Sequence, residues 1–232
     1  MIPVEDNVAW HEVSLSSALA AIFRGKLCDT LLQNRSVIAF DKDKVIYEIG
    51  DKNHTFFFIR RGFVKLGTIT EDGHEIIYDI RKDGDVVGEL CVCEYPRRDR
   101  AVAIEQTEVI PVAYAEILGT LQKNPDLLRG LVEVFCGSLS DACDQIEMLA
   151  VDDTVRRLVK VLLKLAAKLG RPSGKGVELA TYMTQEEISQ VVIARRERVS
   201  TALNFLRRRG MVQYARDGHL VLNVKMLENY LA

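Results

Sequence analysis

The sequence predicts an α+β protein with an N-terminal antiparallel β-roll of the jelly-roll kind, one long helix, and a small C-terminal helical module. Three observations predict it: short β-branched runs between residues 36 and 113, a helical period from residue 124 onward, and a reversal of net charge near residue 153. The 232 residues are 48% hydrophobic and 28% charged, which is typical of a folded chain with a substantial core.

The N-terminal half reads as short strands separated by turn signals. Runs rich in Val, Ile, Phe and Thr recur at intervals typical of a sandwich, jelly roll or barrel. Asp72-Gly73, between two of these runs, is a hairpin signal. The predicted strands are Val37–Phe40, Val45–Tyr47, Thr55–Ile59, Phe63–Ile69, Ile76–Ile80, Val102–Ile104 and Thr107–Val112.

A long helix is predicted to begin at Pro125-Asp126, because proline is favoured in the first helical turn. Its apolar residues alternate in steps of four and three, which is the pattern of a coiled-coil seam. The seam is Leu128, Val132, Phe135, Leu139, Ala142, Ile146 and Leu149. A helix packed on its own β domain is the alternative, but the strict alternation favours pairing with a second copy of the chain.

Net charge divides the chain into an acidic and a basic part. Residues 1–153 hold 16 Lys and Arg against 27 Asp and Glu, a net of −11, whereas residues 154–232 hold 15 against 6, a net of +9. A basic face attracts polyanions, of which nucleic acid is the commonest. Two solvated faces of opposite sign are the alternative, but a net of +9 on 79 residues favours a polyanion partner. Asp152-Asp153 can cap a new helix through Leu169, and residues 171–176 read as a loop.

The basic part contains the signature of a winged helix-turn-helix. Thr184 and Glu187 form a capping box for a short helix through Val192, and a second helix is expected from Arg196 to Arg209, closed by Gly210. Residues 211–222 then read as a two-stranded hairpin with a basic tip, which is the wing. A surface helical hairpin without DNA binding is the alternative.

The second helix carries the predicted base readout. Arginine near the start of a recognition helix can bind two guanine acceptors, while glutamate accepts from cytosine. We therefore expect Arg196 and Glu197 to read bases, and Thr184 and Gln185 to bind phosphate at the first helix. The full predicted DNA-binding set is Thr184, Gln185, Arg195, Arg196, Glu197, Arg198, Ser200 and Thr201.

This order of elements resembles the bacterial family of the cyclic AMP receptor protein and the fumarate-nitrate regulator. The resemblance rests on the motif at 84–90 (GDVVGEL), Asn124–Leu128, and the stretch from Thr184 to Leu206 with its Arg196-Glu197. It implies an effector-sensing β-roll with an N-terminal helix (1–123), a dimerisation helix and hinge (124–152), and a winged helix-turn-helix (153–232). It also implies a homodimeric transcription regulator that binds a near-palindromic duplex and contacts RNA polymerase.

The effector site that the resemblance implies departs from the cyclic AMP pattern. Gly88 and Glu89 match the residues that meet the ribose and phosphate region, but the Arg-Ser pair for the cyclic phosphate falls on Asp99-Arg100. Asp99 would repel a phosphate, and a one-residue slip would bring Arg98 or Arg100 into the role. The polar pair that contacts adenine falls on Ala142-Cys143. The expected effector set is Gly88, Glu89, Leu90, Arg98, Arg100, Ala142 and Cys143, with cyclic AMP, another ligand or none as the effector.

The recognition segment departs from the family pattern too. Ile193 stands in the turn where a glycine is usual, and Thr201 replaces an arginine often found there. The family half-site therefore cannot be carried over to every position.

Other chemistry finds little support in the sequence. Five cysteines form no even-numbered framework and suit reduced thiols in a cytoplasm. Cys91 and Cys93 would share one face if they lay on a strand and would diverge on a helix, and with Cys143 they leave a redox switch or a metal site open. Only Cys28 lies where an N-terminal iron–sulfur cluster would need several thiolates. The sequence shows no set of metal ligands and no hydrolase or P-loop motif, so no motif in it points to an enzyme. It also shows no apolar run long enough to predict a membrane span. A ligand-independent regulator, or a nucleotide-binding module acting on a protein partner, remain the alternatives.

Overall fold

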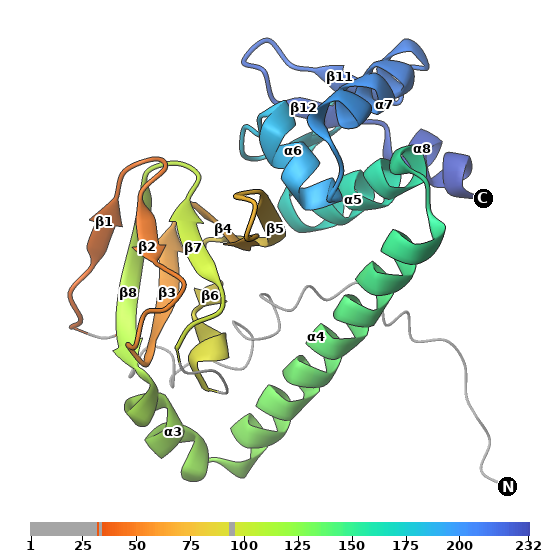
Figure 1. Ribbon diagram of the computed structural model, residues 1–232. Helices are drawn as coiled ribbons and strands as arrows, with labels where there is room; N and C mark the ends of the chain where they lie inside the picture. The colour runs from red at the N-terminus through yellow and green to blue at the C-terminus, as the bar shows by residue number, and fades with distance from the viewer. Residues whose placement is uncertain (1–31, 33, 93–95) are drawn as a thin grey trace, which may run out of the picture.

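The computed structural model describes residue 32 and residues 34–92 and 96–232, and within these it has the predicted α+β architecture. Figure 1 shows a β-roll, a long diagonal helix and a C-terminal module beyond it. The predicted N-terminal helix, Cys28 and Cys93 lie outside the described residues.

Two four-stranded antiparallel sheets form the roll, in the orders β1-β8-β3-β6 and β2-β7-β4-β5. Alternating inward residues such as Phe57, Val64 and Val109 fill the space between them. The strands are β1 (Ile38–Phe40), β2 (Val45–Tyr47), β3 (Thr55–Arg61), β4 (Phe63–Ile69), β5 (Glu75–Lys82), β6 (Val86–Val87), β7 (Arg100–Ala103) and β8 (Thr107–Ala113). All seven predicted strands are present within a few residues, and β6 is an addition.

Helix α3 (Tyr114–Gln122) follows the roll, and α4 (Pro125–Val151) begins at the predicted proline. Most seam residues of α4 face solvent: Leu139 and Ile146 are each 67% exposed and Val132 is 54% exposed, while Phe135 is half-buried. The chain's own β domain therefore leaves most of the seam uncovered, and pairing with a second copy stays the prediction for this helix. A long row of exposed apolar side chains is typical of a helix that pairs with a partner.

The C-terminal module begins with the helix that the sequence predicted after Asp152-Asp153. Asp153 Oδ1 accepts hydrogen bonds from the amides of Val155 and Arg156 and so caps α5 (Thr154–Leu169). Helices α6 (Gln185–Val192), α7 (Arg196–Arg208) and α8 (Val224–Leu231) follow, with a sheet ordered β11-β12-β10-β9. Its strands are β9 (Gly170–Ser173), β10 (Gly176–Leu179), β11 (Val212–Tyr214) and β12 (Leu220–Leu222).

The prediction of a loop at 171–176 was wrong. Residues 170–179 form the β9–β10 hairpin, and β10 pairs with β12 of the wing. The short turn between the two strands hid the signal, since Arg-Pro-Ser-Gly-Lys-Gly reads as loop without its partner strand. Proline at 172 is tolerated because β9 is the edge strand of this sheet.

One apolar cluster joins the β-roll to the C-terminal module. It contains Ile77 and Ile80 of the roll together with Leu162 and Leu165 of α5 and Ile188 of α6. Figure 1 shows β4 and β5 reaching from the roll toward α5 and α6. In the described part of the chain, no helix is both long and apolar enough to cross a bilayer.

Candidate nucleic-acid interface and effector site

The helix-turn-helix forms through its local capping signals. Thr184 Oγ1 accepts from the Glu187 amide at 3.1 Å, and Glu187 Oε2 accepts from the Thr184 amide at 2.8 Å, which completes the predicted capping box. Ile193 ends α6 in the left-handed region with φ of 54°, although glycine adopts this conformation at lower cost. The tight turn between α6 and α7 therefore forms with isoleucine at the position where the family usually has glycine.

Replacing Thr184 with alanine should remove one cap and leave the Glu187 amide without its partner. We expect a loss of about 1 kcal/mol in the free energy of unfolding of the C-terminal module. Chemical denaturation of Thr184→Ala beside Thr184→Ser, which keeps the hydroxyl, measures the effect. Equal stability of the two variants would show that the capping box contributes nothing here.

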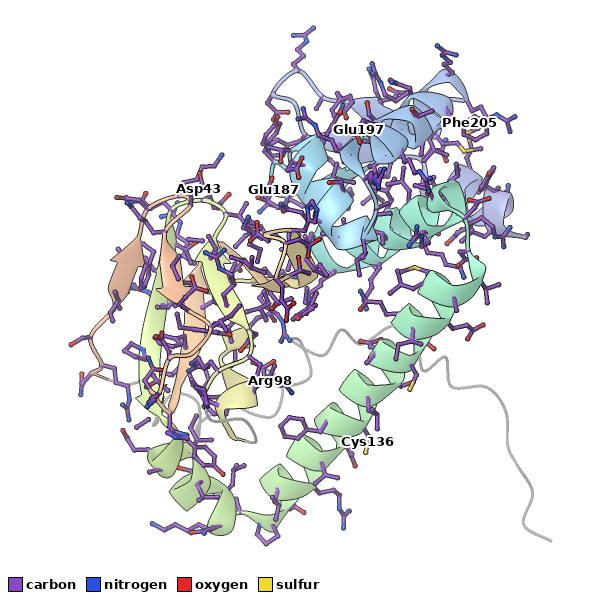
Figure 2. The ribbon with its side chains drawn as sticks, viewed as in Figure 1. Asp43, Arg98, Cys136, Glu187, Glu197 and Phe205 are labelled. Carbon is purple, nitrogen blue, oxygen red and sulfur yellow. The ribbon has the colours of Figure 1, made fainter. Side chains whose placement is uncertain are left out.

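Helix α7 buries one face and presents the other. Val199, Leu203 and Leu206 pack into the core at 1% exposure or less. The opposite face carries the predicted readout residues, and Arg195, Arg196, Glu197, Arg198 and Thr201 are all exposed, while Ser200 is half-buried. Figure 2 shows Glu197 and Phe205 along this helix. A rigid helix thus holds arginine and glutamate side chains free to enter a major groove.

The contacts of the readout residues within the chain are weak. Arg196 Nε lies 3.9 Å from Glu186 Oε2, and both side chains are more than half exposed. Thr201 Oγ1 donates to the Glu197 carbonyl at 2.9 Å. A shallow groove of about 570 Å³ lies between the first turn of α5 and Glu197, Arg198 and Thr201 of α7. The exposed ion pair contributes little to stability, so a base can replace it at low cost.

The predicted phosphate contacts at the start of α6 are placed differently from one another. Gln185 is half-buried. The Thr184 hydroxyl is already engaged, because it accepts from the Glu187 amide and donates to Glu187 Oε2 at 2.8 Å.

At the far end of α7, Arg207 stacks over Tyr214 and Arg209 over Phe205, which orders both guanidinium groups.

In the β-roll, Gly88 and Glu89 stand at the start of the short 3-10 helix η1 (Glu89–Val92). Gly88 has φ of 93°, and a Cβ there would lie 2.8 Å from the Thr55 carbonyl, so glycine is required. Glu89 is 6% exposed, and its Oε1 lies 3.0 Å from Arg81 Nη2. The carboxylate expected to accept from a ribose hydroxyl is therefore already paired.

Arg97 lies beside these residues and is 2% exposed. Its guanidinium donates to the Gly88 carbonyl at 3.1 Å, to Asn53 Oδ1 at 3.0–3.1 Å, and to the Thr55 carbonyl at 2.6 Å. It also lies 4.0 Å from the centre of the Tyr47 ring. The arginine nearest to Gly88 is thus held by the roll's own carbonyls.

Asp99 completes this polar cluster from the next strand. Tyr47 Oη donates to Asp99 Oδ2 at 2.7 Å. Burial raises the pKa of Asp99 above its ordinary value, although the Tyr47 hydrogen bond and Arg97 oppose the rise. Burial and the Asp99 charge also raise the pKa of Tyr47, so the phenol stays protonated. The cluster places a carboxylate where the cyclic AMP pattern requires a cation.

Replacing Asp99 with asparagine should stabilise the protein at pH 7. Because the pKa of Asp99 is higher in the folded protein than in the unfolded chain, the neutral carboxyl stabilises the folded state. This contribution to stability is present at low pH and is lost as the pH rises through the folded-state pKa. Asparagine is neutral at every pH, so the gain in melting temperature should shrink as pH falls toward about 4. Asp43→Asn, in the exposed β1–β2 turn, is the control. A destabilised Asp99→Asn at pH 7 would contradict this account.

The structure separates the remaining effector residues. Arg98 and Leu90 are exposed, and Arg98 borders a pocket with Ile49, Gly50, Pro96 and Arg97. Arg100 turns to Glu48 at 3.2 Å and Glu75 at 3.9 Å. Ala142 and Cys143 are exposed on α4. Within one chain, therefore, only Gly88 and Glu89 of the predicted set lie together at the polar cluster.

Several residues of this site were missed from the sequence. Tyr47, Asn53 and Arg81 belong to no recognisable sequence motif. The predicted effector set contains Arg98 and Arg100 but not their neighbour Arg97. Cys91 lies in the short helix η1 and not on a strand. Its thiol is buried and its pKa is raised by burial, which disfavours the reactive thiolate.

Comparison with known proteins matches both halves of the chain. The cyclic nucleotide-binding domain family matches residues 37–124, and the Crp-like helix-turn-helix domain family matches residues 156–230. The chain belongs to the CRP/FNR family of transcription regulators. Regulators of this family bind DNA and act as dimers, and they are not enzymes.

Relatives of this CRP/FNR chain cover most of its length. The global nitrogen regulator of a Synechocystis strain is 29% identical over 88% of this chain and 92% of its own. A CRP-like cAMP-activated global transcriptional regulator of Mycobacterium tuberculosis is 27% identical over 84% and 89%. The structure of FixK2 from Bradyrhizobium japonicum shares the fold, with a TM-score of 0.74 at 24% identity over 85% of this chain and 98% of that one.

Proposed function

We propose that this CRP/FNR protein is a homodimeric regulator that reads a near-palindromic duplex through α7 and is controlled through its β-roll. The observation that carries the proposal is the exposed Arg196-Glu197 face of α7, fixed by a capped helix-turn-helix. The exposed seam of α4 supports the dimer, and the net charge of +9 over residues 154–232 supports attraction to phosphate. RNA polymerase is the proposed protein partner, in the cytoplasm.

Selection from a random duplex library, followed by a salt titration, tests this function. The expected result is an enriched site and an affinity that falls steeply with salt, because Lys and Arg release counterions from DNA. The enriched site should bind about 10³-fold or more tightly than random duplex. Equal binding to all duplexes would leave only a basic surface and would contradict sequence reading by α7.

A second candidate is regulation without cyclic AMP. Glu89 is paired with Arg81, Arg97 is held by carbonyls, and Asp99 adds a buried carboxylate of raised pKa. Cyclic AMP offers a hydroxyl and an anionic phosphate, and both would have to displace these internal bonds. The atypical cluster therefore favours an effector of other chemistry, or none.

Calorimetric titration with cyclic AMP separates the two cases. We expect no micromolar binding across several temperatures, because binding must break buried, charge-assisted contacts. The selected duplex, titrated in parallel, is the positive control for folded protein. Micromolar binding would show that the cluster opens for the nucleotide, and would make cyclic AMP the signal.

A further inference from the structure

The β-roll and the C-terminal module meet at a surface that no predicted motif marked. Ile77 and Ile80 of β5 pack in one cluster with α5 and α6, and Figure 1 shows β5 between the roll and these helices. The readout residues of α7 stay exposed in this arrangement. The contact therefore fixes the module while leaving its DNA-binding face accessible.

Lys168 crosses this apolar contact as a buried cation. Its side chain is 5% exposed, and its Nζ donates to Asp79 Oδ1 of β5 at 2.5 Å. Lys82 Nζ, from the same strand, donates to the Lys168 carbonyl at 2.7 Å, near the C-terminal end of α5. The Lys82 ammonium is favoured there, because the last carbonyls of a helix lack backbone partners and carry partial negative charge. Both bonds join β5 directly to α5.

Arg81 continues the chain of charges into the effector region. Its Nε lies 2.7 Å from Asp79 Oδ2, and its Nη2 lies 3.0 Å from Glu89 Oε1. Arg81 is 2% exposed. Lys168 and Arg81 together hold the pKa of Asp79 below its ordinary value, against the opposing effect of burial. Three ion pairs thus run without a break from Glu89 to α5.

We propose that Asp79 and Lys168 are positioning residues that hold the C-terminal module against the β-roll, and that Arg81 ties their contact to Glu89. The proposal rests on the function proposed above. Removing one partner of a buried ion pair leaves an uncompensated charge, so every pair in the chain depends on its neighbours. A change at Glu89 alters the partner set of Arg81, then of Asp79, and so reaches α5. Glu89 is thereby linked to the placement of α7.

Hydrogen exchange of the full chain without DNA tests the positioning role. In Lys168→Met, we expect amides of 75–82 and 163–170 to exchange about tenfold faster or more, because the contact opens locally. Lys175→Met is the control, since Lys175 is exposed in the turn between β9 and β10 of the same module. Lys168→Arg, which keeps the charge, should restore slow exchange. If Lys168→Met unfolds the module, Asp79→Asn gives the same readout from the roll. Exchange matching the Lys175→Met control would overturn the proposal.

A double-mutant cycle tests the link to Glu89. Glu89→Gln should speed exchange at 163–170, and the effect should vanish in the Lys168→Met background because the chain is already broken. Glu48→Gln is the control, since Glu48 pairs with Arg100 in a separate network. Equal effects of Glu89→Gln in both backgrounds would overturn the link. Because these experiments contain no DNA, their failure is distinguishable from failure of the proposed function.

Discussion

Replacing Arg196 with alanine should weaken binding to the selected duplex by about 1–3 kcal/mol, and should relax preference at one base pair of each half-site. The side chain stands at the first position of α7 and is exposed, and among the described residues its ion-pair partner is Glu186, 3.9 Å away. Its guanidinium is therefore available to bind two acceptors of guanine. The loss comes from specific binding, so affinity for random duplex should change little.

Fluorescence anisotropy on the selected duplex, on single-base variants of it and on random duplex measures this effect. Arg208→Ala is the matched control, because Arg208 is exposed at the far end of the same helix. We expect the control to weaken all duplexes alike, as a phosphate contact does. If Arg196→Ala also weakened every duplex equally, its base-reading role would be wrong.

Replacing Leu139 with lysine should separate the dimer. Leu139 lies mid-seam on α4 and is 67% exposed in the single chain, so its apolar surface needs a partner. A lysine there would face the same position of the second copy and bring two charges together in an apolar seam. Since two linked half-sites gain affinity over one, binding to the full site should fall by ~10²-fold or more.

Sedimentation analysis gives the mass of each variant, and anisotropy gives its affinity. Asp144→Lys is the matched control, because it places the same residue on an exposed position outside the seam. Ala142→Glu, a second seam variant, should behave like Leu139→Lys. A dimer that persists in both seam variants would mean that the chain associates through another surface.

The sequence predicted the local elements well because their signals are local. The capping box at Thr184, the N-cap at Asp153, the Pro125 helix start and the alternating strands each depend on neighbouring residues, and each appears in the structure. The exposed face of α7 that carries the predicted readout residues followed from the same periodicity. The β9–β10 hairpin was missed because its pairing with β12 is not local.

The polar cluster of the roll could not be predicted in the same way. Arg97, Asn53 and Tyr47 come from separate loops and strands, and only the folded roll brings them to Gly88. Three arginines crowd residues 97–100, and a motif alignment cannot say which of them turns inward. In the sequence, Lys168 looks like an ordinary surface lysine of a basic helix. Its burial and its ion pair with Asp79 arise only because β5 packs against α5 in the folded chain.

Varying the spacing between half-sites tests the central claim most directly. If two copies of α7 enter successive major grooves, binding requires half-sites about one helical turn apart on one face of the duplex. We predict that inserting five base pairs between the half-sites of the selected duplex removes specific binding, and that ten base pairs in total restore part of it. Unchanged affinity after the five-base-pair insertion, or equally tight binding to a single half-site, would contradict a dimer that presents its recognition helices together.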